Sequence, residues 1–218
     1  MAHEFTSIAA DENTPTFIAA DYLLGVVQRI VASRENSRVI IQGFGEIAIL
    51  PGRQEYYTNA QNLTELCSVP SPQVEVQRMG EATPSNSSGS VRNINELLWT
   101  AAFYASQGRL IEGRSKYDVV QFRNWPNLTR LPVTSNAARI CALLTRHPTT
   151  IMLLHRVLGI DKEEVYQIYS AAYCAGIANT SKRALESAIS EAEAVSAQPE
   201  PAQERSLFRS LFSKISGL

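Results

Sequence analysis

The sequence predicts an α+β fold: a small N-terminal helix plus β-hairpin module, a winged-helix-like helical half, and a C-terminal amphipathic segment. Four observations support this prediction. Residues 16–33 place apolar side chains at helical spacing, and residues 38–50 form two β-rich runs separated by a glycine-containing turn. After residue 92 the apolar spacing is almost entirely helical, and residues 149–178 have the pattern of a helix, a tight turn and a second helix.

The N-terminal α+β module is expected over residues 15–79, after a flexible tail at residues 1–14. Its helix, residues 16–33, would start at Thr14-Pro15, because proline is favoured at the first helical position. The hairpin that follows would end at Pro51-Gly52. The remaining elements are short apolar runs between turn residues, and we expect a strand at 53–58, a short helix at 59–66 and a strand at 74–77.

A linker is predicted at residues 80–91, because residues 80–90 contain many turn formers and no large apolar side chain. A helical, winged-helix-like domain then follows over residues 92–180. Its first helix would be capped by Asn93 or Asn95 and stopped by Gly108. The expected elements of this domain are a helix at 93–106, a β-like segment at 117–122, a bend at Trp125-Pro126, a helix at 135–145 and the two helices of 149–178.

The composition is that of a globular protein, with 44% hydrophobic and 19% charged residues in a chain of 218. The formal net charge of −1 argues against non-specific binding of nucleic acid, which requires an excess of Lys and Arg. The three cysteines lack the paired spacing of disulfides or zinc sites, and we expect Cys141 and Cys174 to be buried apolar residues. The acidic N-terminus is no secretory signal, and no apolar run is long enough to span a membrane, so the predicted location is cytoplasmic.

The helix-turn-helix pattern is compatible with a DNA reader or with a protein-binding module. In a DNA reader the second helix enters the major groove with its N-terminus, but here that end is Asp161-Lys162-Glu163-Glu164, with a net charge of −2. No basic β-wing is expected either, because residues 179–181 are predicted to lead into another helix. Protein interaction is therefore favoured. In the alternative, a winged-helix transcription regulator, the DNA contacts would come from Arg139, Arg146, Arg156 and Lys162.

No motif in the sequence assigns a reaction. Gly43-x-Gly45 lies in a hairpin and is not a dinucleotide fingerprint, and no phosphate-binding lysine loop is present. His147 and His155 have no further ligands at suitable spacing, so we expect no metal, no cofactor and no catalytic residue. Trp125 either marks an exposed site or anchors its loop on the helical core. The candidate protein-binding surface consists of Trp125, Arg130, Lys162, Glu163 and Glu164.

A polar helix and tether at residues 181–204 lead to an amphipathic tail at residues 205–218. The tail has three basic residues and no acidic side chain. It is suited to weak binding at an anionic membrane interface, to docking on a partner, or to packing on its own protein. Its candidate interface residues are Leu207, Phe208, Arg209, Leu211, Phe212, Lys214 and Ile215.

Two parts of the chain resemble bacterial signalling proteins. A helix, the hairpin at 38–50, Pro51-Gly52 and then Tyr56-Tyr57 before a short helix resemble the order of the bacterial PATAN-type signalling module. The helical half is similar to uncharacterised proteobacterial proteins associated with Mgl-like small GTPases and roadblock-type partners. The segments that carry this second similarity are Leu97-Leu98-Trp99, residues 125–129 and residues 169–172.

The resemblance implies a non-enzymatic adaptor or effector that binds protein partners in signalling, polarity or surface motility. A small GTPase or a roadblock-type protein is the partner that it implies. It transfers no catalytic residue to this chain. The tail adds the expectation of a peripheral contact with the inner membrane.

Overall fold

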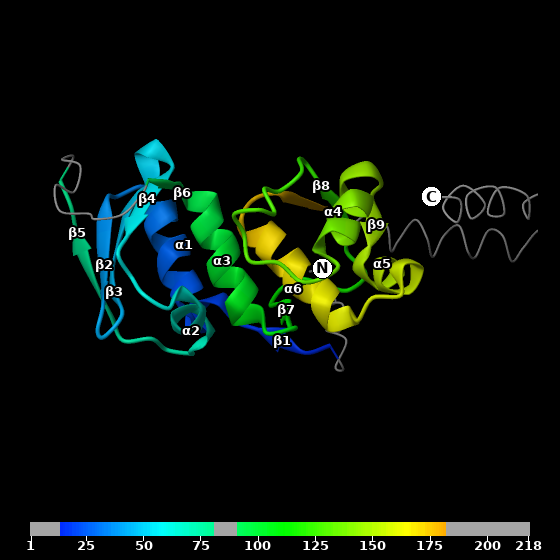
Figure 1. Ribbon diagram of the computed structural model, residues 1–218, viewed down its shortest axis with the longest axis horizontal. Coiled ribbons are helices and arrows are strands. Elements are labelled where there is room, and N and C mark those ends of the chain that lie inside the picture. The colour runs from blue at the N-terminus through cyan, green and yellow to red at the C-terminus, as the bar shows by residue number, and fades with distance from the viewer. Residues whose placement is uncertain (1–13, 81–90, 182–218) are drawn as a thin grey trace, which may run out of the picture. The chain divides into compact units, whose positions relative to one another are not determined.

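The computed structural model describes residues 14–80 and 91–181, which all belong to one compact unit, Met1–Lys182 (Figure 1). Helices and antiparallel strands are mixed in this unit, which confirms the α+β class. Among the described residues, no helix combines the length and the apolar character that crossing a bilayer requires.

The first helix is shorter than predicted. Helix α1 spans Leu23–Ser33, whereas residues 16–22 form the short strand β1 (Thr16–Phe17) and a 3-10 turn, η1 (Ala19–Asp21). Strand β1 pairs in parallel with β7 (Leu110–Ile111), and the amide of Glu112 donates to the carbonyl oxygen of Phe17 at 2.9 Å. The backbone of Phe17 is thus used for a long-range strand pairing, which is incompatible with the predicted helical turn.

A five-stranded antiparallel sheet in the order β5-β2-β3-β4-β6 forms the N-terminal part of the unit. The predicted hairpin is confirmed, with Val39 opposite Ile47 across its two strands. Gly45 begins the second of these strands at φ 115°, and an added Cβ would lie 2.8 Å from Asn59 Oδ1, so this position requires glycine. The strands are β2 (Ser37–Ile41), β3 (Gly45–Leu50), β4 (Glu55–Thr58), β5 (Val74–Arg78) and β6 (Arg92–Asn93), with the turn η2 (Pro51–Arg53) and helix α2 (Leu63–Ser68) between them.

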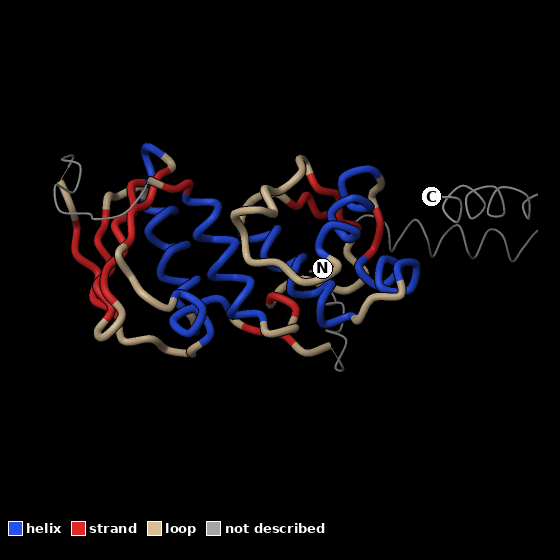
Figure 2. Tube along the Cα trace, in the orientation of Figure 1, coloured by secondary structure: helices blue, strands red, loops and turns tan. Residues whose placement is uncertain are grey.

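Helix α3 (Ile94–Ser106) begins as predicted, because the Asn93 side-chain oxygen accepts from the amide of Asn95 at 2.8 Å. Helices α1 and α3 lie on the same side of the five-stranded sheet (Figures 1 and 2), where α1 contacts β3 and α3 contacts β4 and β6. The opposite side of α3 packs against α6 (Lys162–Cys174).

Helix α3 joins two hydrophobic clusters. Its residues Ile94, Leu97 and Ala101 belong to a cluster with α1 and the sheet, whereas Trp99 and Phe103 belong to a cluster with α4 (Ala137–Arg146), α5 (Ile151–Leu158) and α6. The helix that follows the predicted linker therefore completes the core of the sheet that precedes it.

The predicted helix, turn and second helix of residues 149–178 are confirmed. Helix α5 ends at Gly159 in the left-handed conformation (φ 62°), and α6 begins after Asp161. The helix expected to follow residues 179–181 lies outside the described residues, and residues 179–181 themselves are extended. They continue β10 (Ala178–Ser181), which pairs with β8 (Val119–Phe122), and β8 also pairs with β9 (Thr149–Thr150).

Candidate protein-interaction surface

Helix α5 exposes apolar side chains on the side that faces away from the core. Leu153 is 50% exposed and Val157 is 51% exposed, whereas Ile151 and Leu154 are buried. The four-residue spacing places Leu153 and Val157 on the same face of the helix. Thr150 fixes the first turn, because its hydroxyl oxygen accepts from the Leu153 amide at 3.1 Å.

A cation lies beside these two side chains, and an aromatic ring lies near the N-terminal end of the helix. Arg156, which is exposed, lies one turn from Leu153 on the same helix. The amide of Met152 donates to the carbonyl oxygen of Lys116, which brings the exposed Tyr117 to the N-terminal end of α5. The ammonium of Lys116 lies 5.2 Å from the centre of the Tyr117 ring. We define the α5 face as Tyr117, Met152, Leu153, Arg156 and Val157.

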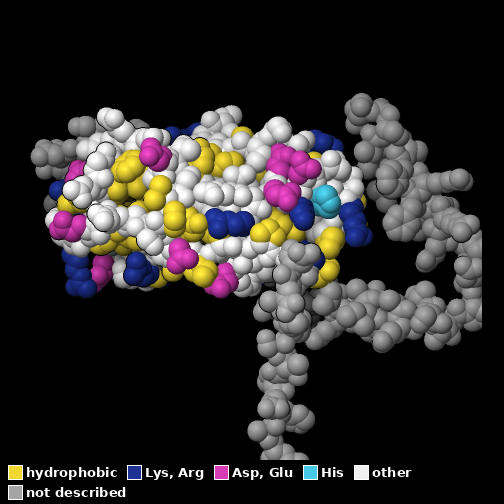
Figure 3. All heavy atoms as spheres, turned by 90° about the horizontal axis from the view of Figure 1, so that it is seen from below, with side chains coloured by type: hydrophobic (Ala, Val, Ile, Leu, Met, Phe, Trp, Pro, Cys, Tyr) yellow, Lys and Arg dark blue, Asp and Glu magenta, His cyan; other side chains and the backbone are white. Residues whose placement is uncertain are grey.

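At the end of the described unit that contains α4 and α5, hydrophobic, basic and acidic side chains and a histidine lie next to each other on the surface (Figure 3). The sequence carries a partial signal for this face, because six of the eight residues 151–158 (IMLLHRVL) are apolar, more than one buried stripe requires. An apolar face that the core leaves uncovered is a candidate surface for interaction.

The predicted site at Trp125 lies on the loop between β8 and α4. Trp125 is 49% exposed, so about half of its side chain is available at the surface. The loop is also held by the indole of Trp99, which donates to Pro132 O at 2.9 Å, and by Arg130, whose Nε lies 3.3 Å from Glu96 Oε1.

The other predicted surface residues lie at the N-terminus of α6. Lys162 and Glu163 are exposed and form an ion pair of 4.0 Å. Glu164 instead links two helices, because its carboxylate accepts from the amide of Asn136 at 2.7 Å and from Asn136 Nδ2 at 2.9 Å at the start of α4. Partial burial would raise the pKa of Glu164, but hydrogen bonds from Thr134, Asn136 and Ser135 outweigh it and leave the pKa lowered.

The four basic residues that would contact DNA in the alternative function are distributed over three helices. Arg139 is used within the protein, with Nη1 donating to Asn136 Oδ1 at 3.1 Å and Nη2 donating to Leu158 O at 2.9 Å. Arg146 ends α4 and Arg156 lies on α5, and both are exposed, while Lys162 pairs with Glu163. The helix that would enter a DNA groove, α6, is largely buried, with Val165, Tyr166, Ile168, Tyr169, Ser170, Ala171 and Ala172 in the interior.

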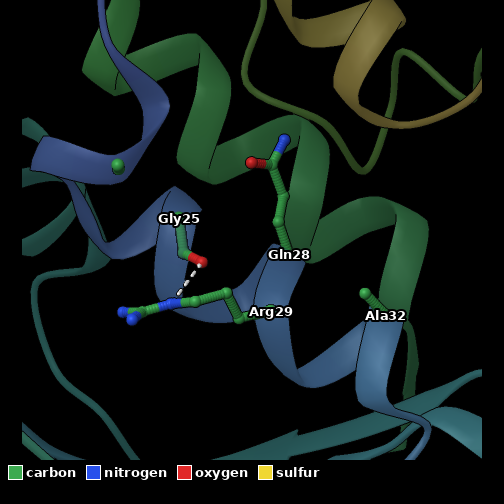
Figure 4. A pocket seen from close by; sticks show the side chains of 5 residues that line it. Gly25, Gln28, Arg29 and Ala32 are labelled. Carbon is green, nitrogen blue, oxygen red and sulfur yellow. Dashed lines mark hydrogen bonds between the residues drawn. The ribbon is translucent and has the colours of Figure 1, made fainter.

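Two shallow hollows lie beside α1. One is lined by small residues and by Gln28 and Arg29, and Figure 4 shows these two side chains leaving the helix in different directions. Arg29 Nε donates to the carbonyl oxygen of Gly25 at 3.3 Å, and Gln28 Nε2 lies 3.8 Å from the sulfur of Cys174 on α6. The lining residues include no nucleophile with a neighbouring base, so this hollow has no catalytic arrangement.

Burial suppresses the reactivity of the three cysteines. Cys67 and Cys141 are buried and Cys174 is half-buried, and burial raises the pKa of each thiol to about 12. Burial also raises the pKa of Tyr169, whose hydroxyl is enclosed near Asp118 and Arg114. These groups stay protonated at neutral pH and are poor nucleophiles. Within residues 14–80 and 91–181, no cluster of His, Cys, Asp and Glu could hold a metal ion.

The tail residues Leu207, Phe208, Arg209, Leu211, Phe212, Lys214 and Ile215 lie outside the described residues, as does the polar helix expected before them. No protein-family model matches the chain. No curated protein and no solved structure is significantly similar to it either. The resemblance to PATAN-type modules therefore stays a prediction, and the α5 face is assigned from its own geometry.

Proposed function

We propose that this protein is a non-enzymatic adaptor that binds a protein partner through the α5 face. The observation that supports this proposal is the exposure of Leu153 and Val157 on a helix whose opposite face is already buried in the core. Covering the exposed half of each aliphatic side chain would contribute about 1 kcal/mol to binding. This is a contribution suited to a partner that binds and dissociates rather than to a permanent subunit.

The chemistry of the α5 face indicates what kind of partner fits it. Leu153 and Val157 would be covered by aliphatic side chains, and Arg156 lies beside them. An amphipathic helix with acidic residues next to its apolar stripe satisfies both requirements, because electrostatic complementarity selects among partners with similar apolar surfaces. From the resemblance to signalling modules, we propose a small GTPase or a roadblock-type protein of bacterial signalling, polarity or surface motility as this partner.

The alternative function, a winged-helix transcription regulator, has weaker support. Strands β9 and β10 accompany α4, α5 and α6, as a winged-helix-like domain would require. The second helix, however, is buried along most of its length, and its first turn carries Glu163 and Glu164. A recognition helix needs an exposed face, and the surface around it needs basic side chains that contact the DNA backbone. We therefore favour protein binding, and we do not assign an activity to the Trp125 loop.

Photocrosslinking in bacterial cells tests the proposal. A benzophenone amino acid at Val157 should crosslink to a distinct protein, and the crosslink should resist nuclease treatment. The matched control is Val69, which is similarly exposed but lies after α2. Arg156→Glu should weaken the crosslink at position 157 through repulsion of an acidic partner. Equal crosslinking from both positions, or recovery of nucleic acid alone, would contradict the adaptor function.

We also propose that the tail, residues 205–218, binds weakly to an anionic membrane. Its apolar residues, such as Phe208 and Phe212, alternate at helical spacing with Arg209 and Lys214. Deleting residues 205–218 should abolish binding to vesicles of anionic lipid and leave the circular dichroism of the remaining protein consistent with a folded α+β unit. A truncated protein that still sediments with these vesicles would refute the role of the tail.

A further inference from the structure

The edge strand β5 leaves its outer backbone unpaired within the described residues. It pairs with β2 over five residues, from Ser37 opposite Arg78 to Ile41 opposite Val74. The amide of Met79 donates to Asn36 O at 2.8 Å, so Met79 and Asn36 form a hydrogen-bonded pair. Hydrogen-bonded and non-hydrogen-bonded pairs alternate from there along the two antiparallel strands. It follows that Gln77 and Glu75 direct their backbone groups toward β2. The N–H and C=O groups of Val74, Val76 and Arg78 therefore point to the free edge.

The side chain of Val76 is exposed beside this edge. Although Val76 lies on the face of the sheet that α1 covers, opposite the buried Val39, it is 48% exposed. Helix α1 lies over β3 and leaves a groove between itself and β5, lined by Val26, Ile30, Val76 and Arg78 among others. In Figure 1, β5 is the outermost strand of the sheet. An apolar side chain and a row of unpaired backbone groups thus occur on one exposed strand, which is a template for pairing with another strand.

We propose that a second copy of this chain pairs with this edge, β5 against β5 in antiparallel orientation, with Val76 opposite Val76. In this register Val74 lies opposite Arg78 of the second copy, and the same pairing recurs across the two-fold axis. The three opposed pairs exchange two N–H···O bonds each, so all six outward N–H groups of the two strands are used. The two sheets become one continuous sheet.

The side chains of β5 are compatible with this symmetric register. Glu75 lies opposite Gln77 of the second copy on the uncovered face, and no like charges oppose each other. If the axis passed through Glu75 instead, two carboxylates would lie directly opposite each other, which is destabilising, and only four backbone bonds would form. The two Val76 side chains meet beside the two grooves, so the exposed apolar surface is reduced. The sequence of the strand is therefore self-complementary, which suits a second copy as its partner.

This pairing goes beyond the proposed adaptor function and does not depend on the α5 face. Sedimentation velocity of the full-length chain should show a reversible dimer. Val76→Asp should raise the dimer dissociation constant at least about tenfold, because two carboxylates then meet at the axis. Gln77→Lys should lower the dissociation constant about threefold, because it forms two cross-strand pairs with Glu75. Circular dichroism of each variant checks that the fold is retained.

Disulfide formation tests the register directly. Directly opposite residues of a hydrogen-bonded pair have Cα atoms about 5.5 Å apart, which is within disulfide range. Val76→Cys should therefore give a covalent dimer under mild oxidation. Gln77→Cys, the matched control on the adjacent residue, should not, because its two copies are offset along the strands. A monomer at about 1 mM, equal crosslinking by both cysteine variants, or a dimer that tolerates both Val76→Asp and Gln77→Glu would overturn the proposal.

Discussion

The sheet half and the helical half of this protein each leave one apolar element without a complete covering, but the two elements differ in chemistry. In the sheet half the uncovered element is β5, where unpaired backbone groups lie beside Val76. In the helical half it is α5, where backbone groups bond within the helix or, as at Met152 and Leu153, to Lys116 and Thr150, and the uncovered groups are side chains, chiefly Leu153 and Val157. A strand edge suits a symmetric, backbone-directed contact, whereas a helix face suits a partner chosen by its side chains.

The two halves are nevertheless joined by one helix. Leu97 of α3 faces the cluster of the sheet half and Trp99 faces the cluster of the helical half, and both side chains are fully buried. Loss of either cluster would expose one side of α3 to water. We therefore expect two distinct surfaces on a single cooperative folding unit.

The largest expected effect comes from breaking this shared helix. Trp99→Ala should lower the free energy of unfolding by about 3–5 kcal/mol, because it removes a fully buried ring and the hydrogen bond to Pro132 O. Urea denaturation measures the loss. Hydrogen exchange should also show faster exchange of amides in β2 and β3, far from the substitution. If only the helical half lost protection, the two halves would be separate folding units.

The local elements of both halves could be predicted from the sequence. The hairpin of β2 and β3 follows from two apolar runs around Gly43 and Gly45, and the start of α3 follows from the side chain of Asn93. The turn between α5 and α6 follows from Gly159, which adopts a positive φ at the end of α5. In each case the determining interaction lies within a few residues of the element.

Elements that depend on distant partners could not be predicted. The apolar spacing of residues 16–22 fits a helix, but Phe17 lies opposite Ile111, a residue from the other half of the chain. Strand β10 has polar residues and forms because β8 offers an edge. The candidate site shows the same limit, since a sequence cannot reveal which apolar side of α5 the core will cover. Leu153 and Val157 were for this reason not among the residues predicted for the site.

A second prediction concerns the contact between β1 and the end of α3. The guanidinium of Arg109 donates to the Tyr22 hydroxyl at 2.8 Å and to the carbonyl oxygens of Ala105 and Ser106 at 2.9 and 3.0 Å. Its central carbon also lies 5.8 Å from the ring centres of Phe17 and Tyr22. Arg109→Ala should therefore lower the free energy of unfolding by about 2–3 kcal/mol.

The urea midpoint measures the effect of Arg109→Ala, and Arg123→Ala is its control. Arg123 is exposed and has a side-chain hydrogen bond to Asn179 at 2.7 Å, so its removal should cost less than about 0.5 kcal/mol. Equal losses for the two variants would show that Arg109 contributes no more than a surface residue. The pairing of β1 with β7 would then have to stabilise the N-terminal segment without it.

A third prediction is a pH dependence that belongs to the helical half. The pKa of Glu164 is lowered in the folded protein, so its carboxylate stabilises the fold above the unfolded-state pKa of about 4.3. This contribution is lost as the pH falls through the lower folded-state pKa. Because Glu164 is only partly buried, solvent screening reduces the effect, and Glu164→Ala should cost about 1 kcal/mol at pH 7.

Urea denaturation at pH 7 and in acid should separate this contribution from simple packing. The difference between the wild type and Glu164→Ala should shrink as the pH falls below 4. Glu163→Ala is the matched control, because Glu163 is exposed and pairs only at 4.0 Å with Lys162, so it should show little difference at either pH. A loss for Glu164→Ala that stays constant with pH would mean that the carboxylate does not link α4 to α6 as a charged acceptor.

The smallest expected change in stability lies on the α5 face, and it distinguishes a binding surface from a part of the core. Leu153→Ser together with Val157→Ser should alter the free energy of unfolding by no more than about 0.5 kcal/mol per site, because both side chains are half-exposed. Leu154→Ala, on the neighbouring residue, should cost about 2–4 kcal/mol, because Leu154 is fully buried in the helical cluster.

The two sets of variants separate folding from binding on one helix. If the serine double variant folds with wild-type stability but loses the crosslink at position 157, the outer face of α5 serves a partner rather than the fold. If it instead destabilises the protein as much as Leu154→Ala, Leu153 and Val157 are part of the core in solution. Their apolar character would then need no partner to explain it, and of the two predicted interfaces only β5 would remain.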